Sequence, residues 1–399
     1  MKIKSIHTAL GASAAALLIG LVGCGGGGDG GDGGISGTGV GTMRLSITDA
    51  PACGYDEVNI TIEKVRVHKL EDAADGDGGW SEVVLNPPKR VDLLTLTNGV
   101  LEELGETSLP AGQYNQMRLV LARNGGGTPL ANSVIPTTTG VETPLTTPSA
   151  QQSGLKLKVN MAVAAGQLAD FAIDFDACKS VVKRGNSGQY NLKPVISVIP
   201  LLSDAGLRVV GYVDTAIANA STTVSVQQGG APIKATVPDV NGRFVLYPVP
   251  AGNYELVVAA AGRVTAVMTG VPVVATSYTT VNSTSFAFLP QPSTSTTVTG
   301  TVTPTTATVR VLQSLTGGPT VEVAWAPVDA DTGAFQTVLP NQAPVRTAYV
   351  ANATTAYTFA SDAAVAGLYA LQAALVGAPP QTQPIDTGAL PPSILFSFP

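Results

Sequence analysis

From residue 42 onward, the chain consists of short stretches in which apolar and polar residues alternate, separated by turns containing glycine or proline. Residues 42–49 (TMRLSITD), 58–68 (VNITIEKVRVH) and 155–159 (LKLKV) show the alternation most clearly. A period of two places every second side chain on one face of a β-strand. The pattern therefore predicts many short strands with one buried face, as in β-sandwiches.

Composition supports the same fold class. Charged residues make up 13% of the 399 residues, while the chain has 44 glycines and 28 prolines. Long surface helices need more Glu, Lys and Arg than this, whereas glycine and proline favour turns between strands. We expect an all-β protein of tandem antiparallel sandwich modules.

Residues 1–24 have the organisation of a bacterial lipoprotein signal. Lys2 and Lys4 precede an apolar segment that ends in residues 21–24 (LVGC), a lipobox. We expect residues 1–23 to be removed and Cys24 to carry a diacylglycerol and usually a further acyl chain such as palmitate. Two or three chains anchor a protein stably to a membrane. The alternative is an ordinary secretory signal cleaved earlier.

Gly25 follows the cysteine, where enterobacterial lipoproteins retained at the inner membrane have aspartate. We therefore expect an outer-membrane location, facing either the periplasm or the outside. Residues 24–41 are glycine-rich and predict a flexible tether. Removing Lys2 and Lys4 changes the net charge from −6 to −8. Without a basic stripe, nucleic acid is not an expected partner.

Two further cysteines remain, Cys53 and Cys178. In an oxidising compartment this even number predicts a disulfide, which would close a loop of about 125 residues. Two buried thiols or a metal site are the alternatives, although no second Cys or His stands beside either residue.

A family resemblance covers about 160 residues. It rests on five motifs: 47–51 (ITDAP), 58–62 (VNITI), 109–114 (LPAGQY), 174–178 (DFDAC) and 190–194 (YNLKP). Together they resemble a bacterial domain-of-unknown-function family, numbered 4382, which occurs in lipoproteins and has no assigned activity. The resemblance implies a β-sandwich over residues 42–202 and carries over no catalytic residue.

The next segment resembles the carboxypeptidase regulatory-like module, a seven-stranded sandwich akin to carbohydrate-binding folds. The matching stretches are 208–213 (RVVGYV), 239–246 (DVNGRFVL) and 249–258 (VPAGNYELVV). We expect this module over residues 207–289. In DVNG the glycine takes the position of positive φ, and in PAGNY the tyrosine ring packs on the core.

The same turn motifs recur further along. Gly300, Gly333 and Gly367 correspond to Gly211, Gly242 and Gly252, at offsets of 89, 91 and 115 residues. The sequence therefore predicts a degenerate second copy over residues 296–399, with an insertion of about 24 residues before its last motif.

Catalytic motifs are missing from the sequence. His68 is the one histidine after the signal, and there is no G-x-S-x-G, H-E-x-x-H or P-loop. We therefore expect no enzyme, no cofactor and no zinc site. The single histidine is expected to be an ordinary surface or half-buried residue.

Two groups of acids leave alternatives open. Asp170, Asp174 and Asp176 could serve as a hydrolase acid pair or bind calcium, or form a polar face opposite the apolar residues of one strand. Asp72, Asp75 and Asp77 resemble part of a calcium loop, or a solvated hairpin tip.

The sequence thus predicts a non-catalytic, lipid-anchored envelope protein that acts as an interaction, adhesion or structural module. Its partners would be the membrane, through the lipid, and an envelope protein or a glycan. One alternative is a carbohydrate-binding lipoprotein that uses Trp80 and Trp325, because sugar sites commonly present exposed aromatic rings. A hydrolase that uses the paired acids is the other.

Overall fold

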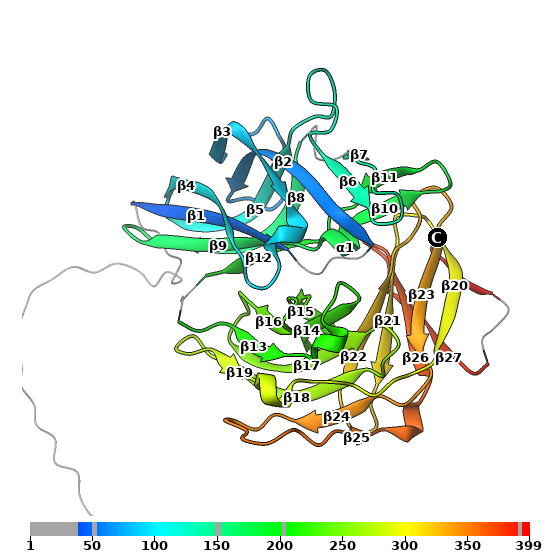
Figure 1. The fold of residues 1–399 in the computed structure, drawn as a ribbon. Helices are drawn as coiled ribbons and strands as arrows, with labels where there is room; N and C mark the ends of the chain where they lie inside the picture. The colour runs from blue at the N-terminus through cyan, green and yellow to red at the C-terminus, as the bar shows by residue number, and fades with distance from the viewer. Residues whose placement is uncertain (1–38, 50–53, 148–152, 202–204, 390–392) are drawn as a thin grey trace, which may run out of the picture. The chain divides into compact units, whose positions relative to one another are not determined.

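The computed structural model describes residues 39–49, 54–147, 153–201, 205–389 and 393–399. The predicted signal peptide, Cys24, most of the predicted tether and Cys53 lie outside these residues. The described residues belong to one compact unit, 35–399, and form 28 strands, one α-helix and four 3₁₀-helices (Figure 1). The predicted all-β fold is therefore confirmed. No helix in this part of the chain is long and apolar enough to cross a membrane.

The first sandwich spans residues 40–200 and consists of two sheets. The smaller has the order β12-β9-β1-β4, and the larger has the order β10-β11-β7-β6-β2-β5-β8, with β3 paired to β2. Its strands are β1 (Val40–Asp49), β2 (Tyr55–His68), β3 (Ser81–Asp92), β4 (Glu102–Pro110), β5 (Gly112–Leu121), β6 (Ser133–Pro136), β7 (Thr143–Thr146), β8 (Leu155–Val163), β9 (Leu168–Phe175), β10 (Val181–Arg184), β11 (Gln189–Leu192) and β12 (Ile196–Pro200).

Alternation fixes which face of these strands is buried. In the parallel pair β1 and β9, Leu45 lies opposite Phe171 and Ile47 opposite Ile173, and all four side chains enter the core. The chain leaves β3 through the 3₁₀-helix η1 (Leu93–Leu96), capped by the Asp92 side chain. A short helix, α1 (Ala177–Ser180), follows β9.

The second sandwich begins at residue 207 and the third at residue 295. The second contains β13 (Val209–Tyr212), η2 (Thr215–Ile217), β14 (Thr222–Gln228), β15 (Ala231–Thr236), β16 (Arg243–Leu246), β17 (Gly252–Ala260), β18 (Ala266–Val273), β19 (Thr279–Thr280) and η3 (Thr284–Phe286). The third contains β20 (Ser295–Thr303), β21 (Thr308–Ser314), β22 (Thr320–Ala326), β23 (Ala334–Pro340), η4 (Ala363–Val365), β26 (Leu368–Ala374), β27 (Gln381–Asp386) and β28 (Ile394–Ser397).

These two sandwiches share their strand order. Sheets β16-β13-β19 and β15-β14-β17-β18 of the second correspond to β23-β20-β28 and β22-β21-β26-β27 of the third. The paired glycines also have equivalent surroundings. Gly242 and Gly333 have φ of +80° and +71°, and a Cβ on either would lie 2.0 or 2.3 Å from the carbonyl oxygen of Val213 or Val302.

A tyrosine hydroxyl bonded to a proline carbonyl recurs in all three sandwiches. Tyr114 donates to Pro110 and Tyr254 donates to Pro250, each at 2.8 Å and four residues away. Tyr369 makes the same bond to Pro340 at 2.7 Å, across 29 residues. The proline and the tyrosine of one motif thus stay together although a long segment separates them in the third sandwich.

That inserted segment, residues 341–366, joins the neighbouring sandwich. Its strand β24 (Val345–Ala348) pairs in parallel with β18, and β25 (Ala360–Ser361) pairs with β24 (Figure 1). Tyr349 and Phe359 pack against the core of the second sandwich. The strand pairing therefore crosses the boundary placed between 289 and 296 from the sequence.

The recurring tyrosine bond gives a stability prediction. We expect Tyr254→Phe and Tyr369→Phe each to lower the free energy of unfolding by about 1 kcal/mol, because a buried tyrosine loses its hydrogen bond to a backbone carbonyl. Urea unfolding midpoints measure this. Tyr278→Phe, at a side chain that is 59% exposed, is the control and should change nothing. If Tyr254→Phe lowers the unfolding midpoint and Tyr369→Phe does not, the two bonds are not equivalent.

Candidate functional site

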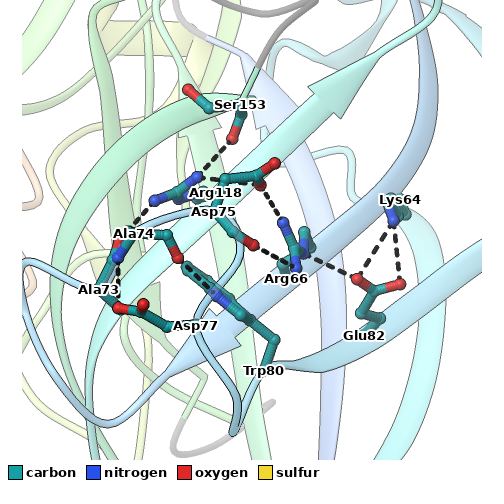
Figure 2. Close-up of polar contacts among 10 residues, drawn as sticks. All are labelled: Lys64, Arg66, Ala73, Ala74, Asp75, Asp77, Trp80, Glu82, Arg118 and Ser153. Atoms are coloured by element: carbon teal, nitrogen blue, oxygen red, sulfur yellow. Dashed lines mark hydrogen bonds and ion pairs between the residues drawn. The ribbon is translucent and has the colours of Figure 1, made fainter.

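Trp80 lies where the loop between β2 and β3 ends (Figure 2). The guanidinium groups of Arg66 and Arg118 lie 4.5 and 4.6 Å from the ring centroid. The ring of His68 lies 5.0 Å away, and the indole nitrogen donates to the Ala74 carbonyl oxygen at 3.0 Å. These contacts make Trp80 the packing centre of its own loop.

Arg118 ties this loop to the sheet. Its side chain is fully buried, and it donates to the carbonyl oxygens of Ala73 and Ser153 at 2.5 and 3.1 Å. It also forms an ion pair with Asp75 at 3.3 Å, and Arg66 binds the same carboxylate (Figure 2). Two of the side chains nearest Trp80 thus share one counter-ion.

The calcium candidates Asp72, Asp75 and Asp77 do not gather around a common point. Asp75 is bound by the two arginines, and Asp77 accepts from the backbone N–H of Ala74 at 2.8 Å. Among the residues that the structure describes, no three His, Cys, Asp or Glu side chains are placed to hold a metal ion.

His68 is more buried than the sequence indicated, at 6% exposure. Its Nδ1 accepts from the Leu70 N–H at 2.9 Å, and its Nε2 lies 3.0 Å from the Gly78 carbonyl oxygen. Because Nδ1 accepts here, Nε2 is the ring nitrogen placed to donate to the Gly78 carbonyl oxygen. Both nitrogens therefore bind the backbone of this loop.

The three acids near the end of β9 separate into different surroundings. Asp170 is bound by Arg44 of β1, and Asp174 by Lys234 of the second sandwich. Asp176 lies beyond the strand, where it caps α1 by accepting from the Lys179 N–H at 3.0 Å. The face they were expected to form is not one polar surface, because Asp174 is covered by the second sandwich.

Lys234 is a buried lysine at this contact. Its side chain is 1% exposed, and its ammonium group donates to the Asp49 carbonyl oxygen at 3.1 Å as well as to Asp174. Burial raises the pKa of Asp49 well above its ordinary value, although the Ala177 N–H donates to it. The first and second sandwiches thus meet through an ion pair that is largely buried.

Glu322 of β22 connects all three sandwiches. Its carboxylate accepts from Lys179 of the first at 2.8 Å and from Arg310 of the third at 3.4 Å. Its backbone N–H and carbonyl both bond to the side-chain amide of Gln227 of the second, each at 2.7 Å. We call Asp176, Lys179, Gln227, Arg310 and Glu322 the junction network.

A cleft of about 510 Å³ opens at this network, and all three sandwiches line it. Trp325 lies in it, with the Lys179 ammonium 5.0 Å from the ring centroid. This volume is within the range of small-ligand sites. The polar side chains that face it include Asp176, Lys179, Ser225, Gln227 and Glu322. The cleft therefore combines an aromatic ring, ionic groups and an amide.

Two ionisable groups of the cleft, Asp176 and Lys179, have shifted pKa values. Burial raises the pKa of Asp176 to about 6, against the lowering effect of Lys179. Burial alone lowers the pKa of Lys179, but the carboxylates of Glu322 and Asp176 more than offset this, so the net shift is upward. Lys179 therefore stays charged at neutral pH, and Asp176 titrates in the mildly acidic range.

The structure assigns different surroundings to the residues flagged from the sequence. Trp80 and Trp325 lie in different sandwiches and form no common platform. Cys178 lies in α1 at the cleft, and Cys24 and Cys53 lie outside the described residues. Sequence reasoning missed Lys179, Lys234 and Glu322. Lys234 is the one charged residue in the strand 231–236 (APIKAT), and that was the only available signal.

The Asp176 carboxyl gives a pH prediction. An unfolded aspartate has a pKa of about 3.9, so the folded chain binds this proton more tightly and loses stability as the pH rises from about 4 to 7. Asparagine keeps the cap but cannot ionise. We therefore expect Asp176→Asn to stabilise by about 1–2 kcal/mol at pH 7.5 and by less at pH 4.5.

Urea midpoints at the two pH values measure the difference. Asp214→Asn changes another helix-capping aspartate, which accepts from Ala216, and measures the effect of exchanging a cap. The prediction is contradicted if the difference in free energy of unfolding between Asp176→Asn and the unaltered chain is the same at both pH values.

Known proteins resemble this chain over part of its length. No curated protein is significantly similar to the chain. A solved type II Cohesin-X-Dockerin complex from Acetivibrio cellulolyticus, a C-terminal interface mutant, is 24% identical over 20% of this chain and 54% of that chain. The match thus spans about half of that chain, and its TM-score of 0.17 is too low to support an argument. Residues 40–194 match the family model described as Domain of unknown function (DUF4382), in agreement with the resemblance noted from the sequence.

Proposed function

We propose that this protein is a non-catalytic lipoprotein of the bacterial cell envelope that binds its partner in the junction cleft. The observation that carries the proposal is the cleft itself, which is lined by all three sandwiches and contains a partly exposed Trp325 beside paired charges. Recognition sites combine such an apolar ring with a few positioned polar groups.

The anchor rests on the lipobox. Residues 21–24 (LVGC) and the apolar segment before them support lipid on Cys24, and Gly25 in place of aspartate supports an outer-membrane location. Cells fed an alkyne analogue of palmitate should label the unaltered chain, whereas Cys24→Ser should abolish the label. Cys178→Ser is the control and should keep it. Label that persists in Cys24→Ser would refute the anchor.

A disulfide between Cys53 and Cys178 belongs to the same proposal. The Asp49 side chain accepts from the Ala177 N–H at 2.9 Å, so the end of β1 lies beside the helix that carries Cys178. Cys53 follows Asp49 by four residues. A bridge here would fix α1, and with it Asp176 and Lys179, at the edge of the cleft.

We also propose that the second and third sandwiches are two copies of one carboxypeptidase regulatory-like module. Their shared strand order, equivalent glycines and equivalent tyrosine bonds support this. The copies differ in residues 341–366, which the third copy contributes to the sheet of the second.

A binding role accounts for the acids better than hydrolysis does. A hydrolytic pair needs one free carboxylate and one protonated acid on either side of the substrate. Here Lys179 lies 2.8 Å from the carboxylate of Glu322 and 3.8 Å from that of Asp176. Asp170 and Asp174 are bound by Arg44 and Lys234. Each acid thus has a cationic partner.

A glycan is the second candidate for the bound partner. Trp325 offers a ring for the C–H faces of a sugar and the Glu322 carboxylate an acceptor for its hydroxyls, whereas the Gln227 amide is already bonded to the Glu322 backbone. The Trp80 ring, by contrast, is packed against two guanidinium groups and is a poorer platform. The carbohydrate alternative therefore rests on Trp325.

Glycan-array binding by the full chain, in a polyoxyethylene detergent without sugar groups, tests the cleft. We expect Trp325→Ala to abolish binding, whereas Val240→Ala, at an 84% exposed valine outside the cleft, should leave it unchanged. If Trp325→Ala retains binding, the glycan binds at a site other than the cleft.

If the array is silent, a photo-crosslinking residue at Val338 of the cleft and another at Val240 compare protein capture on intact cells. Specific capture at Val338 supports a protein partner. Substrate turnover that is lost in both Glu322→Gln and Asp176→Asn would overturn the non-catalytic proposal.

A further inference from the structure

Aromatic side chains gather at a second place, which shares no residue with the lining of the junction cleft. Aromatic residues are only 5% of the chain, yet four of them line one cavity of about 270 Å³: Phe286, Phe288, Tyr357 and Phe359. The first two follow β19 in the second sandwich, and the other two come from the inserted segment 341–366. The cavity therefore depends on the pairing of β24 with β18.

The rings are inclined to one another and do not stack. Phe288 lies 5.7 Å from Phe359 with the ring planes at 90°, and 6.1 Å from Tyr357 at 53°. A flat sugar platform needs coplanar rings, which this cluster lacks. The perpendicular rings of Phe288 and Phe359 have the relative orientation of two adjacent walls of a box, and the negative faces of aromatic rings attract cations.

Backbone bonds fix both sides of the box. The Phe288 N–H donates to Tyr212 and its carbonyl accepts from Asp214, both at 2.9 Å. On the other side, the Tyr357 hydroxyl donates to the Val350 carbonyl at 3.0 Å, and the Tyr349 N–H donates to Thr269 at 2.9 Å. Preformed walls lose little entropy when a ligand binds.

Three backbone carbonyls in the wall formed by residues 286–291 already accept hydrogen bonds. The Phe286 carbonyl accepts from Asn282 at 3.2 Å, Pro290 from Arg263 at 3.2 Å, and Gln291 from the Val264 N–H at 3.0 Å. No charged side chain lines the cavity. A guest with N–H or O–H donors would find these three carbonyls already engaged, and each donor left unsatisfied costs about 1–3 kcal/mol.

We propose that this aromatic box binds a quaternary ammonium group, as in choline or a betaine. Such a cation has no donors to satisfy and gains from the surrounding ring faces. The small volume admits a headgroup of this size. The Arg263 charge opposes the cation, whereas the net charge of −6 favours it. The proposal does not depend on the junction cleft.

Calorimetric titration of the full chain in polyoxyethylene detergent tests this, with choline, glycine betaine and phosphocholine. The neutral isostere 3,3-dimethylbutanol has the same shape as choline without the charge. We expect choline to bind roughly tenfold more tightly than the isostere. The tighter of betaine and phosphocholine assigns the source to a free osmolyte or to a lipid headgroup.

Variants separate cation recognition from packing. Phe359→Leu keeps an apolar side chain and should weaken choline about tenfold while leaving the isostere unchanged. Arg263→Gln keeps a donor for Pro290 and should tighten choline alone. Tyr278→Ala, outside the cavity, is the control. Equal affinity for choline and the isostere, or no binding of either by the folded chain, overturns the proposal.

Discussion

Charge buried between the sandwiches is the constraint on which their arrangement depends. Lys234 and Asp174 are both buried and come from different sandwiches, and Glu322 accepts from Lys179 across another contact. A buried pair gains little net stability because both ions lose water, but an ion left without its partner costs about 3–5 kcal/mol. These pairs therefore act mainly against wrong arrangements. Any other docking of the three sandwiches would leave a buried lysine or carboxylate without its counter-ion.

The same constraint explains why polar groups gather at the cleft. Three sandwiches that meet cannot fill all the space between them with rigid sheets, so a gap lined by all three remains. Glu322 and Gln227 bond directly across it, and Trp325 covers part of it beside Lys179. The side chains that fix the arrangement are thus the same ones that a ligand would meet.

Much of the fold could be predicted from the sequence, because strands and turns depend on neighbouring residues. Alternation located β1, β2 and β8, and the offsets of paired glycines revealed an insertion. What lay beyond reach were contacts between distant residues. Lys234 and Asp174 are 60 residues apart, and Lys179 and Glu322 are 143 apart. Asp75 resembled a metal ligand in the sequence because nothing there showed that it pairs with two arginines, Arg66 of β2 and Arg118 of β5. The glycine offsets gave the length of the insertion, but not the sheet it joins.

The pairing of β24 with β18 has a consequence for how the chain is made. Val345 lies opposite Ala266, so β18 is synthesised long before the strand that covers its edge. Until then β18 presents unpaired backbone groups, the feature through which sheets aggregate. Domains generally fold in order as they emerge, but here the second sandwich waits for the third. A mutation that slows the third sandwich would therefore prolong the exposure of an edge in the second, and the damage would arise in a module whose own sequence is intact.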